Sequence, residues 1–202
     1  PKPVINGLQT AIVIGGDVGQ PQHDVSGRIK VQFHWDKVGG DSPSCWIRVA
    51  QTMASSGLGI QFIPRVGDEV LVSFVNNDPD QPLVISSVYN SKNPPPYNEL
   101  NSTQSGIKTQ LGETANEIRF DDKKDNEQIY FHAAKDHIIE IENDFKQTVT
   151  NEFSSTTEKA ITVTGNDNYA LTIKETLAEK AKQITMEADD KITLTVGSNS
   201  IE

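Results

Sequence analysis

The 202-residue sequence predicts an all-β protein with two differently built parts. Short segments in which polar and apolar residues alternate with period two occur in both parts, as expected for half-buried strands. All ten prolines lie at or before Pro96, and ten of the 14 glycines lie at or before Gly67. Threonine has the opposite distribution, with two residues before position 99 and 14 after it. The first part is therefore rich in turn formers, and the second in a residue that favours strands.

Five strands are expected in the first part, at residues 11–14, 28–35, 46–50, 69–75 and 83–89. The second of these alternates most regularly, and its aromatic residues Phe33 and Trp35 share one face, which we expect to point to the core. Glycine, asparagine and aspartate between the strands supply the turns. Five short strands suggest a small barrel or sandwich, and an OB-type barrel is one of the few five-stranded options.

A triple proline, Pro94 to Pro96, marks the change between the two parts, and it favours a stiff, extended chain. The charge changes at the same place. Residues 1–98 hold 7 basic and 8 acidic side chains, a net charge of −1, whereas residues 99–202 hold 11 and 20, a net charge of −9. We therefore expect a first domain at 1–93, a proline-containing linker at 94–115 and a second domain at 116–202.

The second part contains alternating stretches of only three to five residues, at 138–141, 161–164, 171–173, 184–186 and 192–196. Their spacing is irregular, roughly ten residues. One such stretch buries little apolar surface, and isolated two-stranded pieces are marginal in water. Identical chains that share one core around an axis would solve this problem. The segment therefore predicts a β-solenoid or an intertwined β-prism.

A helix at 174–182 is an open alternative. Ile173, Leu177, Ala181 and Ile184 follow helical spacing, and the residues between them include good helix formers. The threonine-rich alternating stretches on both sides favour a strand, because a lone helix between them would interrupt the stacking of strands. The sequence leaves both structures open.

Composition and charge exclude several classes of protein. The net charge of −10 argues against general affinity for nucleic acid, which requires phosphate-neutralising charge. The single cysteine, Cys45, excludes an internal disulfide and a cysteine-based zinc site. No apolar run is long enough to span a membrane, and the chain opens without a signal-peptide pattern.

No group of residues predicts catalysis, a metal site or a cofactor. The four histidines do not pair at metal-ligand spacing, and carboxylate pairs such as Asp121 and Asp122 lie in polar turns. One basic and aromatic cluster, Arg28, Lys30 and Trp35, is of the kind that OB barrels use to bind single-stranded nucleic acid or glycan. The net charge of the first domain argues against the nucleic acid.

Several long motifs resemble the VgrG (valine-glycine repeat protein G) family, and they occur in one order along the chain. They lie at residues 27–36, 44–51, 62–70, 78–85, 88–90, 104–108 and 116–123. The resemblance covers roughly residues 4–145, and the rest of the chain matches only in character. The family's large N-terminal hub has no counterpart, so the chain corresponds to a C-terminal fragment. Valine-glycine repeats are sparse, with Val163-Thr164-Gly165 and Val196-Gly197 the nearest traces.

The resemblance implies a spike of bacterial type VI secretion, similar to the central spike of contractile phage tails. In that family an OB-fold domain leads into an intertwined triple-stranded β-helix (β-prism) formed by a homotrimer. It implies a secreted tube protein below the spike, contacted through the hub, and a PAAR-type tip protein and effectors above. The spike would wait in the bacterial cytoplasm and then be injected through the target cell envelope, with no nucleic acid as partner.

In such a prism the inward side chains of the three chains would form one core. The proposed core residues are Ile161, Val163, Leu171, Ile173, Ile184, Met186, Ile192, Leu194 and Val196. Two other classes remain open: an OB-fold module that binds single-stranded nucleic acid or glycan, and a glycan-cleaving phage-type enzyme with paired carboxylates on a trimeric shaft. The second ranks last, because no insertion is large enough to build a substrate cleft.

Overall fold

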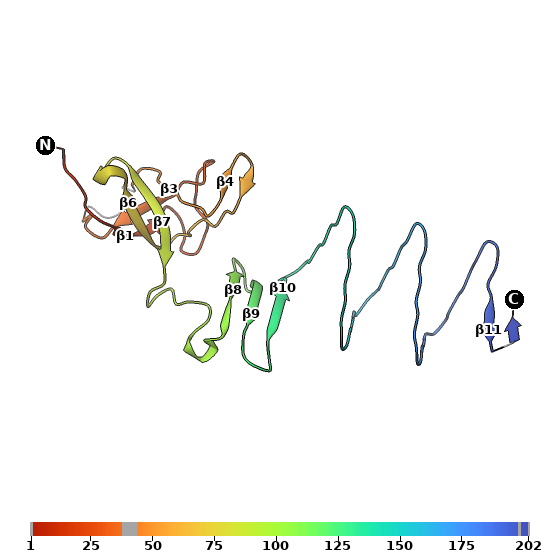
Figure 1. Cartoon of the computed structure of the whole chain (residues 1–202). Helices are drawn as coiled ribbons and strands as arrows, with labels where there is room; N and C mark the ends of the chain where they lie inside the picture. The colour runs from red at the N-terminus through yellow and green to blue at the C-terminus, as the bar shows by residue number, and fades with distance from the viewer. Residues whose placement is uncertain (1, 38–43, 198, 202) are drawn as a thin grey trace. The chain divides into compact units, whose positions relative to one another are not determined.

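The computed structural model describes residues 2–37, 44–197 and 199–201. The chain forms two units, Pro1–Glu142 and Asn143–Glu202, and each is described by itself. The first unit contains a barrel and a three-stranded sheet (Figure 1). The second consists mainly of extended chain.

A five-stranded sheet forms the barrel, with strand order β2-β1-β6-β7-β3. Its strands are β1 (Gln9–Ile14), β2 (Lys30–Phe33), β3 (Arg48–Val49), β6 (Glu69–Phe74) and β7 (Pro82–Val88). All neighbours are antiparallel except β3 and β7, which run parallel. The five expected strands are confirmed, although the second and third are shorter than expected.

An isolated bridge closes this sheet into a barrel. The backbone N–H of Ile29 donates to the Ile47 carbonyl over 2.9 Å, and the N–H of Ile47 donates back over 2.8 Å. This pair joins the start of β2 to the start of β3, the two ends of the strand order. The sheet therefore has no free edge at this level, as in the OB-fold barrel that the sequence predicts.

Alternate residues of the strands fill the interior of the barrel, as period-two patterning requires. The buried core consists of Ala11, Val13, Ile29, Val31, Ile47, Val70, Val72, Phe74 and Val84. Phe33 packs against this core, but Trp35 does not: it follows the end of β2, stacks on Phe33 at 4.9 Å and is 56% exposed. The expectation that both aromatics face the core is thus wrong for Trp35.

The barrel also carries two smaller elements that the sequence analysis did not predict. A short hairpin of β4 (Ala54–Ser55) and β5 (Leu58–Gly59) follows β3, and a 3-10 turn, η1 (Val75–Asn77), joins β6 to β7. Neither contributes to the barrel core.

The loop before β2 is organised by the Asp24 carboxylate. It accepts hydrogen bonds from the backbone N–H groups of Ser26 and Arg28, each 2.9 Å long, and from Arg28 Nε over 2.7 Å. The bond with the Arg28 side chain, and the backbone bonds after it, hold the pKa of Asp24 below its ordinary value.

We expect the stability of the barrel to fall in acid partly through Asp24. A carboxyl group whose pKa is lowered by folding stabilises the folded state above its unfolded pKa, and this contribution is lost as the pH falls through the folded value. Asp24→Asn should therefore lower the melting temperature at neutral pH, and the difference from the unmodified chain should vanish in strong acid. Asp17→Asn, at an exposed position, is the control. A constant difference at every pH would contradict this role.

A second sheet lies between the barrel and the end of the first unit. Its strands are β8 (Gln104–Thr109), β9 (Asn116–Asp121) and β10 (Gln128–His132), in the antiparallel order β10-β9-β8. The 3-10 turn η2 (Glu99–Asn101) precedes β8. The range 94–115, expected to be a linker, thus contains a paired strand, because β8 finds its partner β9 immediately after it in the chain.

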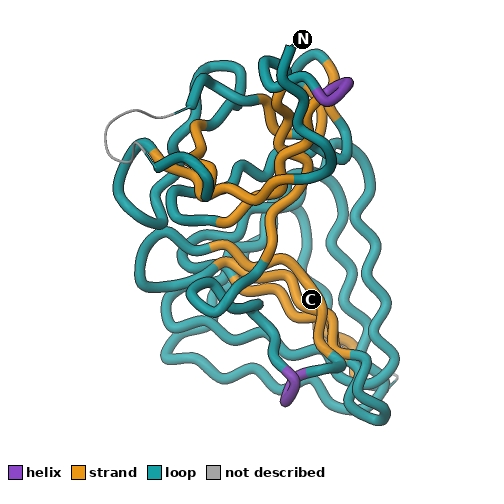
Figure 2. Tube along the Cα trace, turned by 90° about the vertical axis from the view of Figure 1, so that its left-hand side faces the viewer, coloured by secondary structure: helices purple, strands orange, loops and turns teal. Residues whose placement is uncertain are grey.

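The second unit contains only two short strands among its described residues, β11 (Leu194–Val196) and β12 (Asn199–Ile201). The rest is extended chain that repeatedly changes direction (Figure 1), and Figure 2 draws it as loop. The helix considered at 174–182 is not formed. Across the described residues of both units, no helix is long and apolar enough to cross a membrane.

Candidate assembly interface

The extended chain of the second unit bends at a regular interval. Paired bends lie at residues 142–143, 150–151, 158–159, 166–167 and 174–175, in steps of eight. The next bends are at 182 and 189–190, so that one step is shortened to seven. The irregular spacing of roughly ten residues expected from the sequence is therefore wrong. The segment is a repeat of eight-residue extended pieces.

A large apolar residue stands two places after every one of these bends. These residues are Phe145, Phe153, Ile161, Tyr169, Leu177, Ile184 and Ile192. The sequence analysis missed Phe145, Phe153, Tyr169 and Leu177 as members of this series. The signal that could have found them is the eight-residue period itself.

Alternation then places the residues four and six after each bend on the same side of the extended chain. We call positions two, four and six of all repeats the apolar face, and the positions between them the polar face. All nine residues proposed from the sequence as core lie on the apolar face. The polar face carries mainly threonine, together with Lys146, Lys180 and Glu187.

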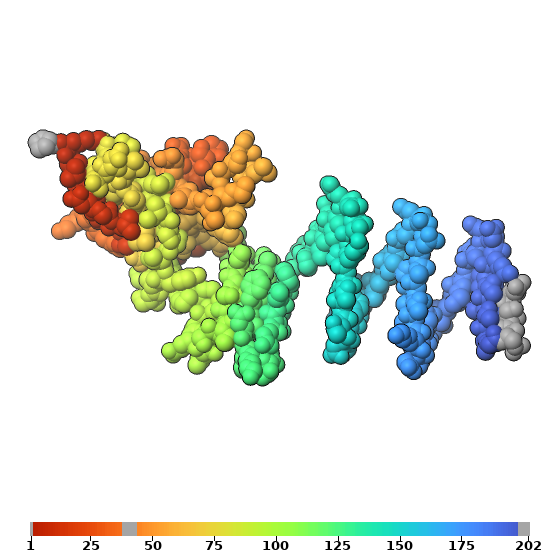
Figure 3. Space-filling view, in the orientation of Figure 1, coloured from red at the N-terminus to blue at the C-terminus, as the bar shows by residue number. Residues whose placement is uncertain are grey.

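Within the part of the chain that the structure describes, nothing covers the apolar face. Every residue from 134 to 197 is exposed, and the fractions for the large apolar side chains include 67% for Ile161 and 75% for Tyr169. Figure 3 shows open space between successive legs of the second unit. Such a long row of exposed apolar side chains is rare on a protein that acts as a monomer, and it marks an interaction surface.

Before β11, the backbone of the same segment also lacks strand pairing within the described part of the chain. No backbone–backbone hydrogen bond joins any two residues of the described stretch 135–190, and the Lys159 N–H donates to the Thr157 side chain over 3.4 Å. Extended chain with unpaired N–H and carbonyl groups is a template for strand pairing with another chain. Strands from further chains, placed beside and between these legs, would therefore cover the apolar side chains and pair with the backbone.

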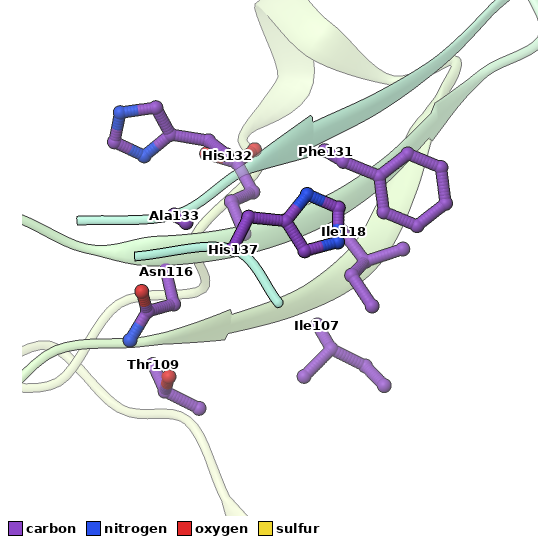
Figure 4. A pocket seen from close by; sticks show the side chains of 9 residues that line it. Ile107, Thr109, Asn116, Ile118, Phe131, His132, Ala133 and His137 are labelled. Carbon is purple, nitrogen blue, oxygen red and sulfur yellow. The ribbon is translucent and has the colours of Figure 1, made fainter. Parts of the chain in front are cut away.

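The three-stranded sheet of the first unit begins a similar apolar face. Ile107, Ile118 and Phe131 lie opposite one another across its three strands, and each is at least 38% exposed. They line a cavity of about 270 Å³ with His137, whose ring lies on the same side in Figure 4. Phe131 is odd-numbered, as are the residues of the apolar face in the first repeats that follow. By this alternation the apolar face already starts in β10.

The opposite face of this sheet is polar and internally paired. Glu117 accepts hydrogen bonds from the Tyr97 hydroxyl and from Arg119, each 3.1 Å long, and the Arg119 guanidinium stacks over the Tyr130 ring at 4.6 Å. Burial, and after it the bond to Glu117, raises the pKa of Tyr97. The sheet therefore presents one face whose side chains are largely paired, with Arg119 Nε buried without a hydrogen-bond partner, and one apolar face that lacks a cover.

Gly106, in the middle of β8, is expected not to tolerate a side chain. A Cβ at this position would overlap the Ile118 carbonyl oxygen and would lie 2.9 Å from the Arg119 Cα and 3.0 Å from the Tyr97 hydroxyl. We expect Gly106→Ala to cost about 1–3 kcal/mol in the free energy of unfolding of this sheet, because backbone must move.

The measurement is hydrogen exchange of the β8 and β9 amides. Gly112→Ala is the control, since nothing lies within 4 Å of a Cβ there. Equal protection of the β8 amides in both variants would contradict the prediction, because it would show that the sheet accommodates a side chain at position 106 without loss of stability.

The other candidate residues from the sequence are not gathered into a site. Arg28 is paired with Asp24 at 2.6 Å, Lys30 lies over the Trp46 ring at 4.8 Å, and Trp35 stacks on Phe33. Asp121 accepts from Thr103 and Gln104 and is thus used within the sheet. Among the described residues, no three His, Cys, Asp or Glu side chains lie close enough to hold a metal ion.

Two family comparisons divide the chain between the barrel and β8, within the first unit. Residues 10–89 match the type VI secretion system/phage-baseplate injector OB domain, and residues 101–202 match the bacteriophage T4 gp5 C-terminal trimerisation domain. The chain belongs to the family of VgrG and phage spike proteins. The all-β fold class, an OB barrel followed by a trimerising β-prism, is thereby confirmed.

Relatives in this family carry the name VgrG. The chain is 44% identical over 152 residues to the type VI secretion system spike protein VgrG1b and 46% identical over 166 residues to VgrG5, both of Pseudomonas aeruginosa. It is 42% identical over 149 residues to the actin cross-linking toxin VgrG1 of Vibrio cholerae. These matches cover 71%, 78% and 71% of this chain but only 20%, 21% and 14% of the relatives. The chain thus spans about a fifth or less of their length.

Proposed function

We propose that this chain, an OB-fold domain followed by a shaft, is a structural, non-catalytic component of a homotrimeric spike, which a type VI secretion (contractile injection) apparatus drives through target envelopes. The observation that carries the proposal is the apolar face from β10 to Val196, which is exposed on the single chain, together with the described stretch 135–190, in which no two residues form a backbone–backbone hydrogen bond. Three copies around an axis bury that face and pair that backbone at once.

The proposed core contains the nine residues expected from the sequence together with the four missed members of the series, Phe145, Phe153, Tyr169 and Leu177. Burial of apolar surface stabilises by about 25 cal/mol per Å², so a face repeated over many layers yields a stiff and stable shaft. Backbone pairing between the chains leaves few free edges, which limits aggregation.

We propose residues 1–93 as the OB-fold domain and count the residues from β8 onward with the shaft instead of with a linker. Family membership suggests the partners. They are a secreted tube protein at the base of the spike, a PAAR-type tip protein and effectors at its tip, and the target envelope, which the spike contacts transiently. The spike is proposed to be assembled in the bacterial cytoplasm and then injected. These partners are proposals from family membership, and no residue of this chain is assigned to them.

Light scattering on the full chain tests the trimer. The expected mass is 66.6 kDa, three times the chain mass of 22.2 kDa. A 22.2 kDa monomer would overturn the shared core. A monomer would instead support the alternative function, an OB-fold module that binds single-stranded nucleic acid or glycan, which the comparisons do not favour.

A chimera tests the role in secretion. These residues replace the matching segment of VgrG1b in a strain that lacks its own spike, and release of the tube protein into the medium is measured. Restored release is expected. A chimera that forms trimers but releases no tube protein would refute the spike function while leaving the assembly intact.

A further inference from the structure

One repeat of the second unit departs from the eight-residue rule. The short repeat, as we call residues 176–182, begins after the bend at 174–175, ends with the bend at 182 and has seven residues. The apolar series confirms the step independently, because Leu177 and Ile184 are seven apart whereas all their neighbours in the series are eight apart. Before the short repeat the apolar face consists of odd-numbered residues, and after it of even-numbered ones.

The short repeat also contains the charged residue of the apolar face. Glu179 stands four places after the bend at 174–175, at the position that Val163, Leu171, Met186 and Leu194 occupy in other repeats. From Phe145 to Val196 every other position of the apolar face is uncharged. The two irregularities of the segment, in length and in charge, therefore coincide in one repeat.

Regular repeats alone specify the alignment of identical chains weakly. If one chain slides by one eight-residue repeat, apolar residues still meet apolar residues, and the backbone pairs as before. Strands with such repetitive patterns are prone to slip in register. Four equal steps separate the bends at 142–143 and 174–175, and several alignments would have similar energy if the fifth step, to the bend at 182, were also eight residues.

The short repeat removes this degeneracy. When it lies beside an eight-residue repeat of a neighbouring chain, the two strands become offset by one residue, and an offset of one exchanges the two faces of a strand. Slippage would also bury Glu179 among apolar side chains of another layer. A polar residue in an apolar seam is known to fix register in this way, with a loss of stability.

We propose that the short repeat, with Glu179, sets the register in which three copies of this chain align. The proposal rests on the homotrimer proposed above and goes beyond it, since a trimer could exist without this device. In register, the three short repeats share one level and the three Glu179 side chains face one another. Any other alignment mismatches both the length and the charge.

The test compares the full chain with a regularised variant that carries Glu179→Leu and one threonine inserted between Ala181 and Lys182. Both carry Cys45→Ser and Thr195→Cys, and a spin label on the new cysteine reports distances between the chains by double electron–electron resonance after refolding. Thr195 lies on the polar face, where a label leaves the core undisturbed. One distance is expected for the native repeat, and an additional, longer distance for the regularised variant.

Lys180→Leu is the matched control, because it introduces the same side chain one position along, on the polar face. It should retain one distance. If the regularised variant does not refold to a trimer, Glu179→Leu alone and the threonine insertion alone decide together: a second distance in either variant supports the proposal, and a single unchanged distance in both overturns it.

Light scattering on the same samples separates the two proposals. A native chain that is not trimeric refutes the homotrimer itself. A trimeric regularised variant with a single, unchanged distance refutes only the register device, and it would place the control of alignment in the barrel or the three-stranded sheet.

Discussion

Ile161→Asp will reduce the chain from a trimer to a monomer. Ile161 occupies position two of its repeat, on the apolar face. With aspartate at this position, the trimer would have to bury three carboxylates in one layer. The effective penalty for burying an unpaired charge is several kcal/mol per ion, and it is incurred three times here. Light scattering should show a fall from 66.6 kDa, three times the chain mass, to 22.2 kDa.

Thr162→Asp is the matched control for this substitution. It adds the same carboxylate one residue further along, on the polar face, where water solvates it, and the mass should stay that of the trimer. Loss of the trimer in both variants would indicate a general effect of charge. A trimer in both would show that position 161 lies outside the core.

The barrel could be predicted from sequence because each of its strands buries its apolar residues within the same chain. In β1, the alternation places Ala11 and Val13 in the core, and in β6 Val70, Val72 and Phe74. The error at Trp35 has a local cause: alternation carries no information beyond the last paired residue, and β2 ends at Phe33.

The second unit was harder to predict, because the spacing of its apolar residues fits both a helix and an extended chain. Ile173, Leu177 and Ala181 are four residues apart, which fits a helical face, but four is also a multiple of two, so the same residues share one face of an extended chain. Local sequence cannot separate these structures. The extended structure is stabilised by pairing with other chains, and no local sequence pattern reports such pairing.

The eight-residue period was hidden by its own exceptions. Gln147 and Ser155 occupy positions of the apolar face in two consecutive repeats, and the short repeat then shifts the series from odd to even numbers. Alternating stretches were visible only where all three positions of a repeat are apolar, as in 192–196. The bends of the backbone were needed to align the rest.

Ile47→Ala will unfold the barrel at lower denaturant while the mass stays at 66.6 kDa, three times that of the chain. Ile47 is 1% exposed, and its backbone makes both bonds of the bridge that closes the barrel. Removing a buried Ile side chain to Ala costs about 2–5 kcal/mol, the loss depending on how far the cavity collapses. Unfolding followed by the fluorescence of Trp46, the adjacent residue, measures this loss.

Arg48→Ala provides the control, since Arg48 follows directly and is exposed. We expect a change within about 0.5 kcal/mol. The two large predictions are opposite in kind: Ile161→Asp removes the trimer and leaves the barrel transition in place, whereas Ile47→Ala weakens the barrel and leaves the trimer. A barrel substitution that also dissociated the chains would show that the barrel, whose core lies within one chain, depends on the trimer for its folding.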